Sequence, residues 1–173
     1  MPEHHDQRLQ ISLFSDSIIL FSPDTGGESL TAIAEAAAYI MRNAIGSGIP
    51  IKGAPAQGVV TNDTDKQLFF GLPIIDAYLL RENVKYYGVV VHHSAEQSVI
   101  GVPLFTDAPT PLRSGKVHHY QLDWFMDSEK QVSEEACRNI EALRYSVSDE
   151  PRKYVDNTME LIRCVSGPAS AAE

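Results

Sequence analysis

Cysteine is scarce in this chain, and long hydrophobic runs are missing. The 173 residues include only two cysteines, Cys137 and Cys164, and no CxxC pair. This excludes a disulfide framework and favours a reducing, cytoplasmic setting. No apolar stretch approaches the roughly 20 residues that a membrane-spanning helix needs. The start, MPEHHDQR, is polar and lacks the apolar segment of a signal peptide. We therefore expect a cytoplasmic protein without a membrane partner.

Positive charge is also in short supply. Lysine and arginine total 14 against 23 aspartates and glutamates, which gives a net charge of −9. This balance argues against nucleic acid as the main partner, because a phosphate backbone needs a basic surface. A single nucleotide needs only a local site and is not excluded. With 43% apolar and 21% charged residues, the chain has the composition and length of one globular domain.

Residues 9–22, LQISLFSDSIILFS, contain two apolar runs that meet at Ser15-Asp16. Short apolar runs between small polar residues are typical of strands, and Ser-Asp is turn chemistry. The stretch predicts a β-hairpin that carries the Asp16 carboxylate at its tip. Such a carboxylate could bind the divalent cation of a nucleoside triphosphate. The alternative is that Asp16 is only a turn residue.

The following segments alternate between helix and strand patterns. Apolar residues recur at helical spacing over residues 30–44, and residues 49–60 have a strand-like pattern interrupted by glycines. Residues 67–70 predict a short strand that pairs with 49–60 in a second hairpin. Gly71-Leu72-Pro73 opens a helix, and 87–91 predict a buried strand. This order predicts an α+β fold with one antiparallel-rich sheet and helices on one face.

The pattern changes after residue 100. Residues 103–116, PLFTDAPTPLRSGK, contain three prolines and predict an irregular or edge segment. A strand at 117–124 and amphipathic helices near 132–143 and 151–162 follow. Trp124 and Phe125 are expected in the core. We expect a core domain at 8–100, a C-terminal extension at 101–165 and a disordered tail at 166–173.

Three segments together resemble a known family. FSDSIIL, IPIKGAPAQGVV and FFGLPIIDAYLLRE, in that order and spacing, resemble the class III nucleotidyl (adenylate/guanylate) cyclase catalytic domain over residues 9–91. PLRSGK and YVDNT are similar to a divergent bacterial group built on that fold. The resemblance implies a ferredoxin-like sheet, Mg²⁺ or Mn²⁺, a nucleoside triphosphate and a homodimer that pairs head to tail.

The resemblance also implies that most catalytic groups are absent. Asp16 matches the second metal-binding aspartate of the family. Ser12 stands where the purine-reading lysine belongs, Ile75 at the transition-state asparagine and Leu79 at the phosphate-binding arginine. The family's first strand, with its own aspartate, has no counterpart before the hairpin. Two cations and preorganised donors are needed for this chemistry, so we expect no confident catalytic residue and no efficient turnover.

Several alternatives stay open. A slipped helix would offer Asp76 and Arg81 as nucleotide-binding substitutes beside Ser15 and Ser17, and would expose the neighbouring apolar positions. Another chain, or an absent N-terminal segment, could supply the missing groups of an active cyclase, a phosphorus-oxygen lyase. The chain could also be a purely structural dimerisation module. Our main hypothesis is a degenerate cyclase-like domain that binds a nucleotide or a partner without efficient turnover.

Two further features favour a structural interpretation. The pairs His4-His5, His92-His93 and His118-His119 resemble metal ligands, but adjacent residues on a strand point to opposite faces. We therefore expect structural or surface histidines. Residues 113–116, Arg-Ser-Gly-Lys, lack the spacing of a phosphate-binding P-loop and predict an exposed basic turn.

Overall fold

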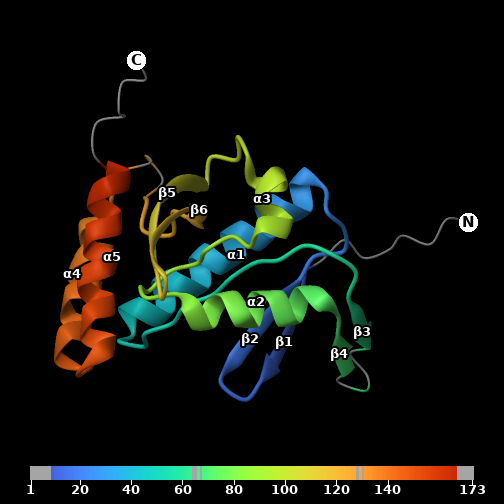
Figure 1. Ribbon diagram of the computed structural model, residues 1–173, viewed down its shortest axis with the longest axis horizontal. Coiled ribbons are helices and arrows are strands. Elements are labelled where there is room, and N and C mark those ends of the chain that lie inside the picture. The colour runs from blue at the N-terminus through green and yellow to red at the C-terminus, as the bar shows by residue number, and fades with distance from the viewer. Residues whose placement is uncertain (1–8, 64–65, 67, 128, 130, 167–173) are drawn as a thin grey trace, which may run out of the picture.

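The α+β class that the sequence predicts is confirmed by the computed structural model, which describes residues 9–63, 66, 68–127, 129 and 131–166 (Figure 1). The strands pair in three two-stranded antiparallel sheets. They are β1 (Gln10–Phe14), β2 (Ser17–Phe21), β3 (Thr61–Asp63), β4 (Leu68–Phe70), β5 (Phe105–Leu112) and β6 (Gly115–Leu122). The helices are α1 (Gly27–Gly46), α2 (Leu72–Asn83), α3 (His93–Val99), α4 (Glu134–Ala142) and α5 (Glu150–Ser166), with a 3-10 turn at Leu143–Tyr145.

The first predicted hairpin is confirmed. β1 pairs with β2 from Gln10 opposite Phe21 to Phe14 opposite Ser17, so the loop has two residues. Ser15, the first of them, has a φ of 54°. Tight hairpin turns require a positive φ at this position because it matches the twist of the strands.

The second hairpin is present, but its predicted first strand at 49–60 is wrong. β3 begins only at Thr61, because the glycines and prolines before it interrupt regular pairing. Gly53 forms a single parallel bridge with Val89, through Gly53 N–H to Gly88 O at 2.9 Å and Val90 N–H to Gly53 O at 3.2 Å. On its other side the row 88–91 is bonded to β6, with Leu122 N–H donating to Val89 O at 2.9 Å. We call residues 88–91 the central row.

The proline-rich segment at 103–116 is an edge strand, one of the two alternatives that its composition left open. β5 carries Pro109 and Pro111 and pairs with β6 through Leu112 opposite Gly115. The two prolines are two residues apart, so both lack a donor on the side facing away from β6. On that side Lys85 N–H donates to Pro111 O at 3.0 Å. Residues 113–114 form the exposed turn, as predicted.

The core lies where α1, α4 and α5 pack against the central row and the residues after β6. Trp124 and Phe125 are buried, as expected from the sequence, and their rings meet edge to face. α4 and α5 stand side by side at one end of the molecule, the β3–β4 hairpin lies toward the other end, and the β1–β2 hairpin projects from the lower middle of the view (Figure 1). The ferredoxin-like arrangement in one continuous sheet stays a prediction. The predicted tail and His4-His5 lie outside the described residues, apart from Ser166 at the end of α5.

The central row gives the first testable prediction. A Cβ on Gly88 would lie 2.1 Å from Cε2 of Tyr86, whose ring is fully buried and cannot move aside. We expect Gly88→Ala to lower the free energy of unfolding by roughly 1–3 kcal/mol, the usual cost of overpacking a core. Urea denaturation followed by circular dichroism measures the loss.

Gly53→Ala is the matched control, since its Cβ would meet Val89 at an ordinary 3.6 Å. Equal stability losses in the two variants would contradict this account of the central row.

Candidate functional site

Asp16, the predicted metal ligand, is exposed to solvent at the tip of the β1–β2 hairpin. Asp16 is exposed in the β1–β2 turn, between Ser15 and Ser17, and Ser17 Oγ donates to Asp16 Oδ1 at 3.4 Å. Within the described ranges, no group of three or more His, Cys, Asp or Glu side chains is placed to hold a metal ion. Asp16 therefore offers one carboxylate at a turn, and its role as a Mg²⁺ or Mn²⁺ ligand stays a prediction.

Helix α2 carries the other predicted positions. Ile75 and Leu79 are each 55% exposed, whereas Asp76 and Arg81 are half-buried. Arg81 binds Glu82 at 2.6 Å and lies over the Tyr78 ring at 5.0 Å. Its charge is thus engaged on the surface of α2 itself.

Asp76 acts on a neighbourhood other than the hairpin tip. Its negative charge, with that of Glu96, raises the pKa of His92, against a larger lowering caused by burial and by the charge of His93. The charge of Asp76 therefore acts on His92 at the start of α3. Ser12, the remaining predicted position, is 9% exposed in the middle of β1.

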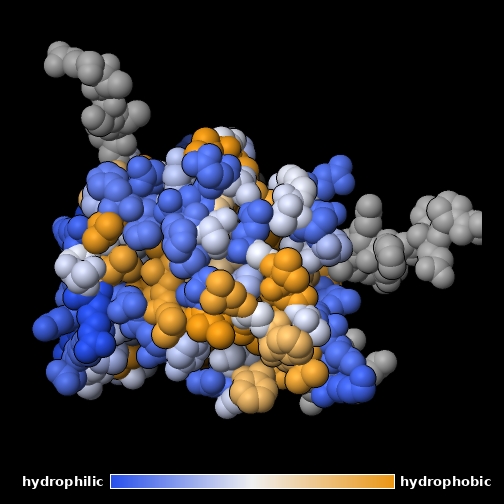
Figure 2. Space-filling view, turned by 45° about the vertical axis from the view of Figure 1, so that its right-hand side comes forward, coloured by the Kyte–Doolittle hydropathy of each residue, from blue (hydrophilic) through white to orange (hydrophobic). Residues whose placement is uncertain are grey.

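Eleven large apolar side chains on these elements are exposed, each between 48% and 90%. We call this set the apolar face. It consists of Ile11, Leu13, Phe14 and Ile18 of the first hairpin, Val59, Leu68 and Phe70 of the second hairpin region, and Leu72, Ile75, Tyr78 and Leu79 of α2. In Figure 2, hydrophobic residues gather in the lower half of one side of the molecule. A patch of this size on a globular protein marks an interaction site.

The first hairpin contributes to this face because one of its sides carries only apolar residues, and the other carries both apolar and polar residues. Ile11 and Leu13 share one side with their cross-strand partners Leu20 and Ile18, and on this side Ile11, Leu13 and Ile18 are exposed while Leu20 is half-buried. The other side meets the second hairpin, where the rings of Phe21 and Phe69 stack at 5.6 Å. A strand pair of this kind is usually covered on both sides, and here only one cover is present among the described residues.

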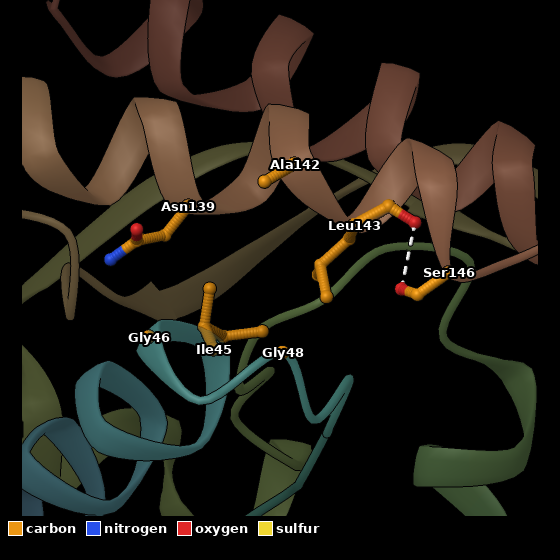
Figure 3. A pocket seen from close by; sticks show the side chains of 7 residues that line it. All are labelled: Ile45, Gly46, Gly48, Asn139, Ala142, Leu143 and Ser146. Carbon is orange, nitrogen blue, oxygen red and sulfur yellow. Dashed lines mark hydrogen bonds between the residues drawn. The ribbon is translucent and has the colours of Figure 1, made fainter.

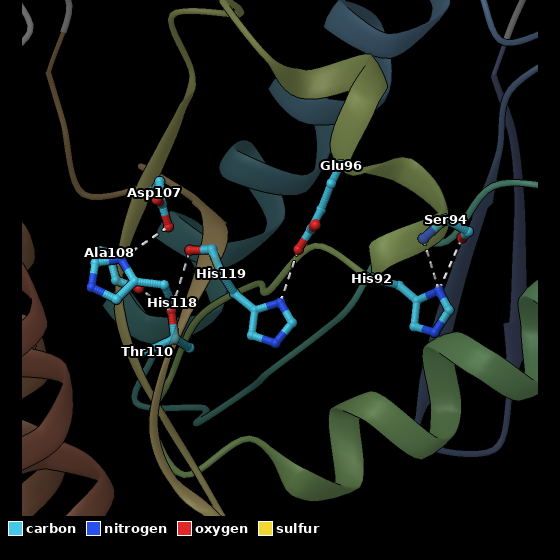
Figure 4. A network of polar contacts seen from close by, with 8 residues as sticks. All are labelled: His92, Ser94, Glu96, Asp107, Ala108, Thr110, His118 and His119. Carbon is cyan, nitrogen blue, oxygen red and sulfur yellow. Dashed lines mark hydrogen bonds and ion pairs between the residues drawn. The ribbon is translucent and has the colours of Figure 1, made fainter.

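His92, His118 and His119 each have a local polar partner (Figure 4). His92 caps α3, and its Nδ1 lies 2.9 Å from Ser94 Oγ. His119 Nδ1 lies 3.1 Å from Glu96 Oε1, which ties β6 to α3. His118 Nδ1 lies 3.4 Å from an Asp107 carboxylate oxygen on the neighbouring strand.

The hollows of the surface are poor nucleotide sites. A cleft of about 160 Å³ between the end of α1 and α4 has no charged side chain in its lining, and Ser146 Oγ donates to Leu143 O within it (Figure 3). A hollow of about 380 Å³ at the start of α1 is lined by Asp24 and Glu28. The Asp24 carboxylate already accepts the Gly26 N–H at 2.8 Å. Two carboxylates at this helix start would repel a phosphate group.

A buried carboxyl, which sequence reasoning missed, lies at the end of β6. Asp123 is 6% exposed, and it accepts hydrogen bonds from Thr106 Oγ1 at 2.6 Å and Gln121 Nε2 at 3.2 Å. Burial raises the pKa of Asp123 to about 6, although both hydrogen bonds lower it. No ion pair to Asp123 occurs among the described residues. The neighbouring Tyr86 hydroxyl is buried without a partner there. The only sequence signal was an acidic residue between apolar ones.

No family model, curated protein or solved structure matches this chain. Within the part of the chain that the structure describes, no helix combines the length and the apolar character needed to cross a membrane.

Asp123 makes stability depend on pH. An unfolded aspartate titrates near pH 3.9, so the raised pKa of about 6 favours the protonated folded state. The stabilisation is complete below about pH 4 and is lost as the pH rises through about 6, by on the order of 2–3 kcal/mol. Asp123→Asn should remove this loss, because the amide stays neutral. Urea denaturation at several pH values between 4 and 8 measures the difference.

Asp107→Asn is the control, because Asp107 is an exposed carboxyl on the same hairpin. It should keep the wild-type decline. If Asp123→Asn declines as steeply as the wild type, the buried carboxyl is not the cause.

Proposed function

We propose that this chain is a degenerate class III nucleotidyl-cyclase-like domain that binds a partner protein without efficient nucleotide turnover. The observation that carries the proposal is the place of Ile75 and Leu79. In the resemblance they take the positions of the asparagine and arginine, and on α2 both side chains lie in the apolar face. Hydrocarbon side chains cannot stabilise the charge that develops on a transferring phosphoryl group.

The size of the apolar face supports a protein partner. An aromatic side chain offers about 150–250 Å² of surface and the aliphatic ones somewhat less, so these half-exposed residues present roughly 1,000 Å² in total, distributed over more than one side of the two hairpins. A stable protein interface needs about 800 Å² from each partner. Leaving so much apolar area in water is unfavourable, by roughly 25 cal/mol for each Å². Association recovers that free energy.

The nucleotide-binding alternative depends on few groups. Ser15, Asp16 and Ser17 would meet a cation–triphosphate at the exposed tip, with Asp76 and Arg81 on α2 as substitutes. Arg81 would first have to leave Glu82. A single exposed carboxylate binds Mg²⁺ weakly, since Mg²⁺ dehydrates reluctantly. The engaged Arg81 and the single exposed carboxylate of Asp16 therefore support a protein-binding module over a nucleotide cyclase.

One observation favours a second candidate, an active cyclase completed by another chain. Within the described residues, β1 and β2 pair only with each other, so the hairpin has free edges where a further strand could add. Such a strand could bring a second carboxylate beside Asp16. In the third alternative, a purely structural dimerisation module, the chain binds no nucleotide and the apolar face serves only for association.

Calorimetric titration tests the proposal. The four nucleoside triphosphates with Mn²⁺ are titrated into the wild type and into Asp16→Ala, and a product assay for cyclic nucleotide runs beside it. We expect no saturable heat and no product from either protein, because the donors at positions 75 and 79 are absent.

If the wild type binds a nucleotide that Asp16→Ala does not bind, the nucleotide site is functional and the proposal of a purely protein-binding module fails. Product formation that depends on Asp16 would favour the active cyclase.

A further inference from the structure

Positive charge collects at the end of α2, although acidic residues outnumber basic ones in the chain by 23 to 14. Lys52 and Lys85 lie over the same Tyr154 ring, with their Nζ atoms 5.2 Å and 5.5 Å from its centre. Lys85 Nζ also binds Glu150 Oε1 at 2.6 Å. Burial lowers the pKa of Lys52, and the nearby charge of Arg81 lowers it further. Three cations from two separate segments therefore share this place.

Two more cations reach the same place from the β5–β6 turn and from α5. The Lys85 hydrogen bond lowers the pKa of the Glu150 carboxyl, and the charges of Lys153 and Arg113 lower it further. The backbone holds the β5–β6 turn here, since Arg113 N–H donates to Asn83 O at 2.8 Å. We call the five cations the basic cluster: Lys52, Arg81, Lys85, Arg113 and Lys153.

The basic cluster has more cations than its own carboxylates neutralise. Arg81 and Lys85 each bind one carboxylate at 2.6 Å. Lys52, Arg113 and Lys153 have no ion pair among the described residues, and the last two are exposed. The other charges at the start of α5 cancel, Asp149 against Arg152. This part of an otherwise acidic surface therefore attracts anionic groups.

The exposed apolar stripe of α2 ends at the basic cluster. Ile75 follows Leu72 by three residues, and Tyr78 and Leu79 follow Ile75 by three and four, so all four lie on one side of the helix. Each is between 55% and 67% exposed. Arg81 lies over the Tyr78 ring at 5.0 Å and so joins the stripe to the cluster. α2 runs from the β3–β4 hairpin toward α5 (Figure 1), and apolar surface is followed by positive charge along about 18 Å of helix.

An amphipathic helix fits this sequence of surfaces. The exposed stripe of one helix packs against the stripe of another by fitting ridges into grooves. Apolar residues at helical spacing on the second helix supply that contact. Carboxylates beyond its stripe would meet the unpaired cations of the basic cluster, whereas lysines there would meet like charge. The charge thus selects the partner and the direction in which it lies on α2.

We propose that the partner is an amphipathic helix of another protein, whose apolar stripe covers Ile75 and Leu79 and whose acidic end binds Lys52, Arg113 and Lys153. This inference rests on the proposed function and states the chemistry of its partner. The apolar contact supplies most of the affinity, and the charges set the register and the specificity.

A displayed library of helical peptides tests the charge of the partner. The peptides have about 18 residues and span about 27 Å as a helix, enough to cover the stripe and the cluster. They carry a fixed leucine stripe and randomised positions at one end. Selection on the wild type should enrich Asp and Glu at the randomised positions. Selection on the double variant Arg113→Gln, Lys153→Gln should not enrich them.

Fluorescence anisotropy of a selected peptide then measures the two parts of the contact. Lys153→Gln should weaken binding about threefold, and Arg163→Gln, which removes an exposed cation further along α5, should not change it. Ile75→Ser should weaken binding about tenfold. Ile100→Ser should not, since Ile100 is exposed to a similar extent, 54%, but lies outside α2. Circular dichroism checks that each variant is folded.

The outcomes separate this inference from the proposed function. Selection without acidic enrichment, equal weakening by Lys153→Gln and Arg163→Gln, or binding that Ile75→Ser leaves unchanged each overturns the acidic helix. If neutral or basic peptides bind instead and Ile75→Ser weakens them, the binding-module proposal stands with a partner of different charge. Nucleotide binding that depends on Asp16 overturns the proposed function, whereas the peptide selection alone decides the charge of the helix.

Discussion

The rest of the structure depends on the hydrogen-bonded central row at residues 88–91. Gly53 on one side and β6 on the other fix its backbone, and Val89, Val90 and Val91 are buried around it. Gly88 has to be glycine, since the Tyr86 ring occupies the place of its side chain. α2 enters this row and α3 leaves it, so the row sets the position of both helices. The helices α1, α4 and α5 complete the core against it.

The β1–β2 hairpin is outside this framework, and that separation explains the surface. Its contacts with the rest of the chain include the stacked rings of Phe21 and Phe69 and a hydrogen bond from Asn62 to Gln10. The hairpin carries apolar residues on both of its sides, and the side with Ile11 and Leu13 is left uncovered. On α2, Ile75 and Leu79 are exposed as well. The folded monomer thus retains apolar surface that its own core does not use.

The sequence predicted elements wherever a single local pattern decides the structure. Ser15-Asp16 between two apolar runs gave the hairpin, and helical spacing gave α1, α2, α4 and α5. It failed where tertiary contacts decide. Residues 49–60 look like a strand, yet only Gly53 finds a partner. β5 tolerates its prolines because their nitrogens face away from β6, which composition alone does not reveal. The burial of Asp123 and the exposure of Ile75 and Leu79 likewise depend on segments distant in the chain.

Under the proposed function, the positions of Ile75 and Leu79 on α2 serve association and not catalysis. A phosphoryl-transfer site needs polar donors held in a cavity that excludes water, whereas an interface core needs side chains that lose little when water leaves. Ile75 and Leu79 have the second property. In the proposed cyclase-like domain, hydrocarbon in place of two donors removes transition-state stabilisation and at the same time adds area that a partner can cover. Under the proposed function, loss of turnover and gain of a binding surface are therefore one change in side-chain chemistry. Asp16, an exposed turn residue, is compatible with either role, and so the side chains of α2 distinguish between them.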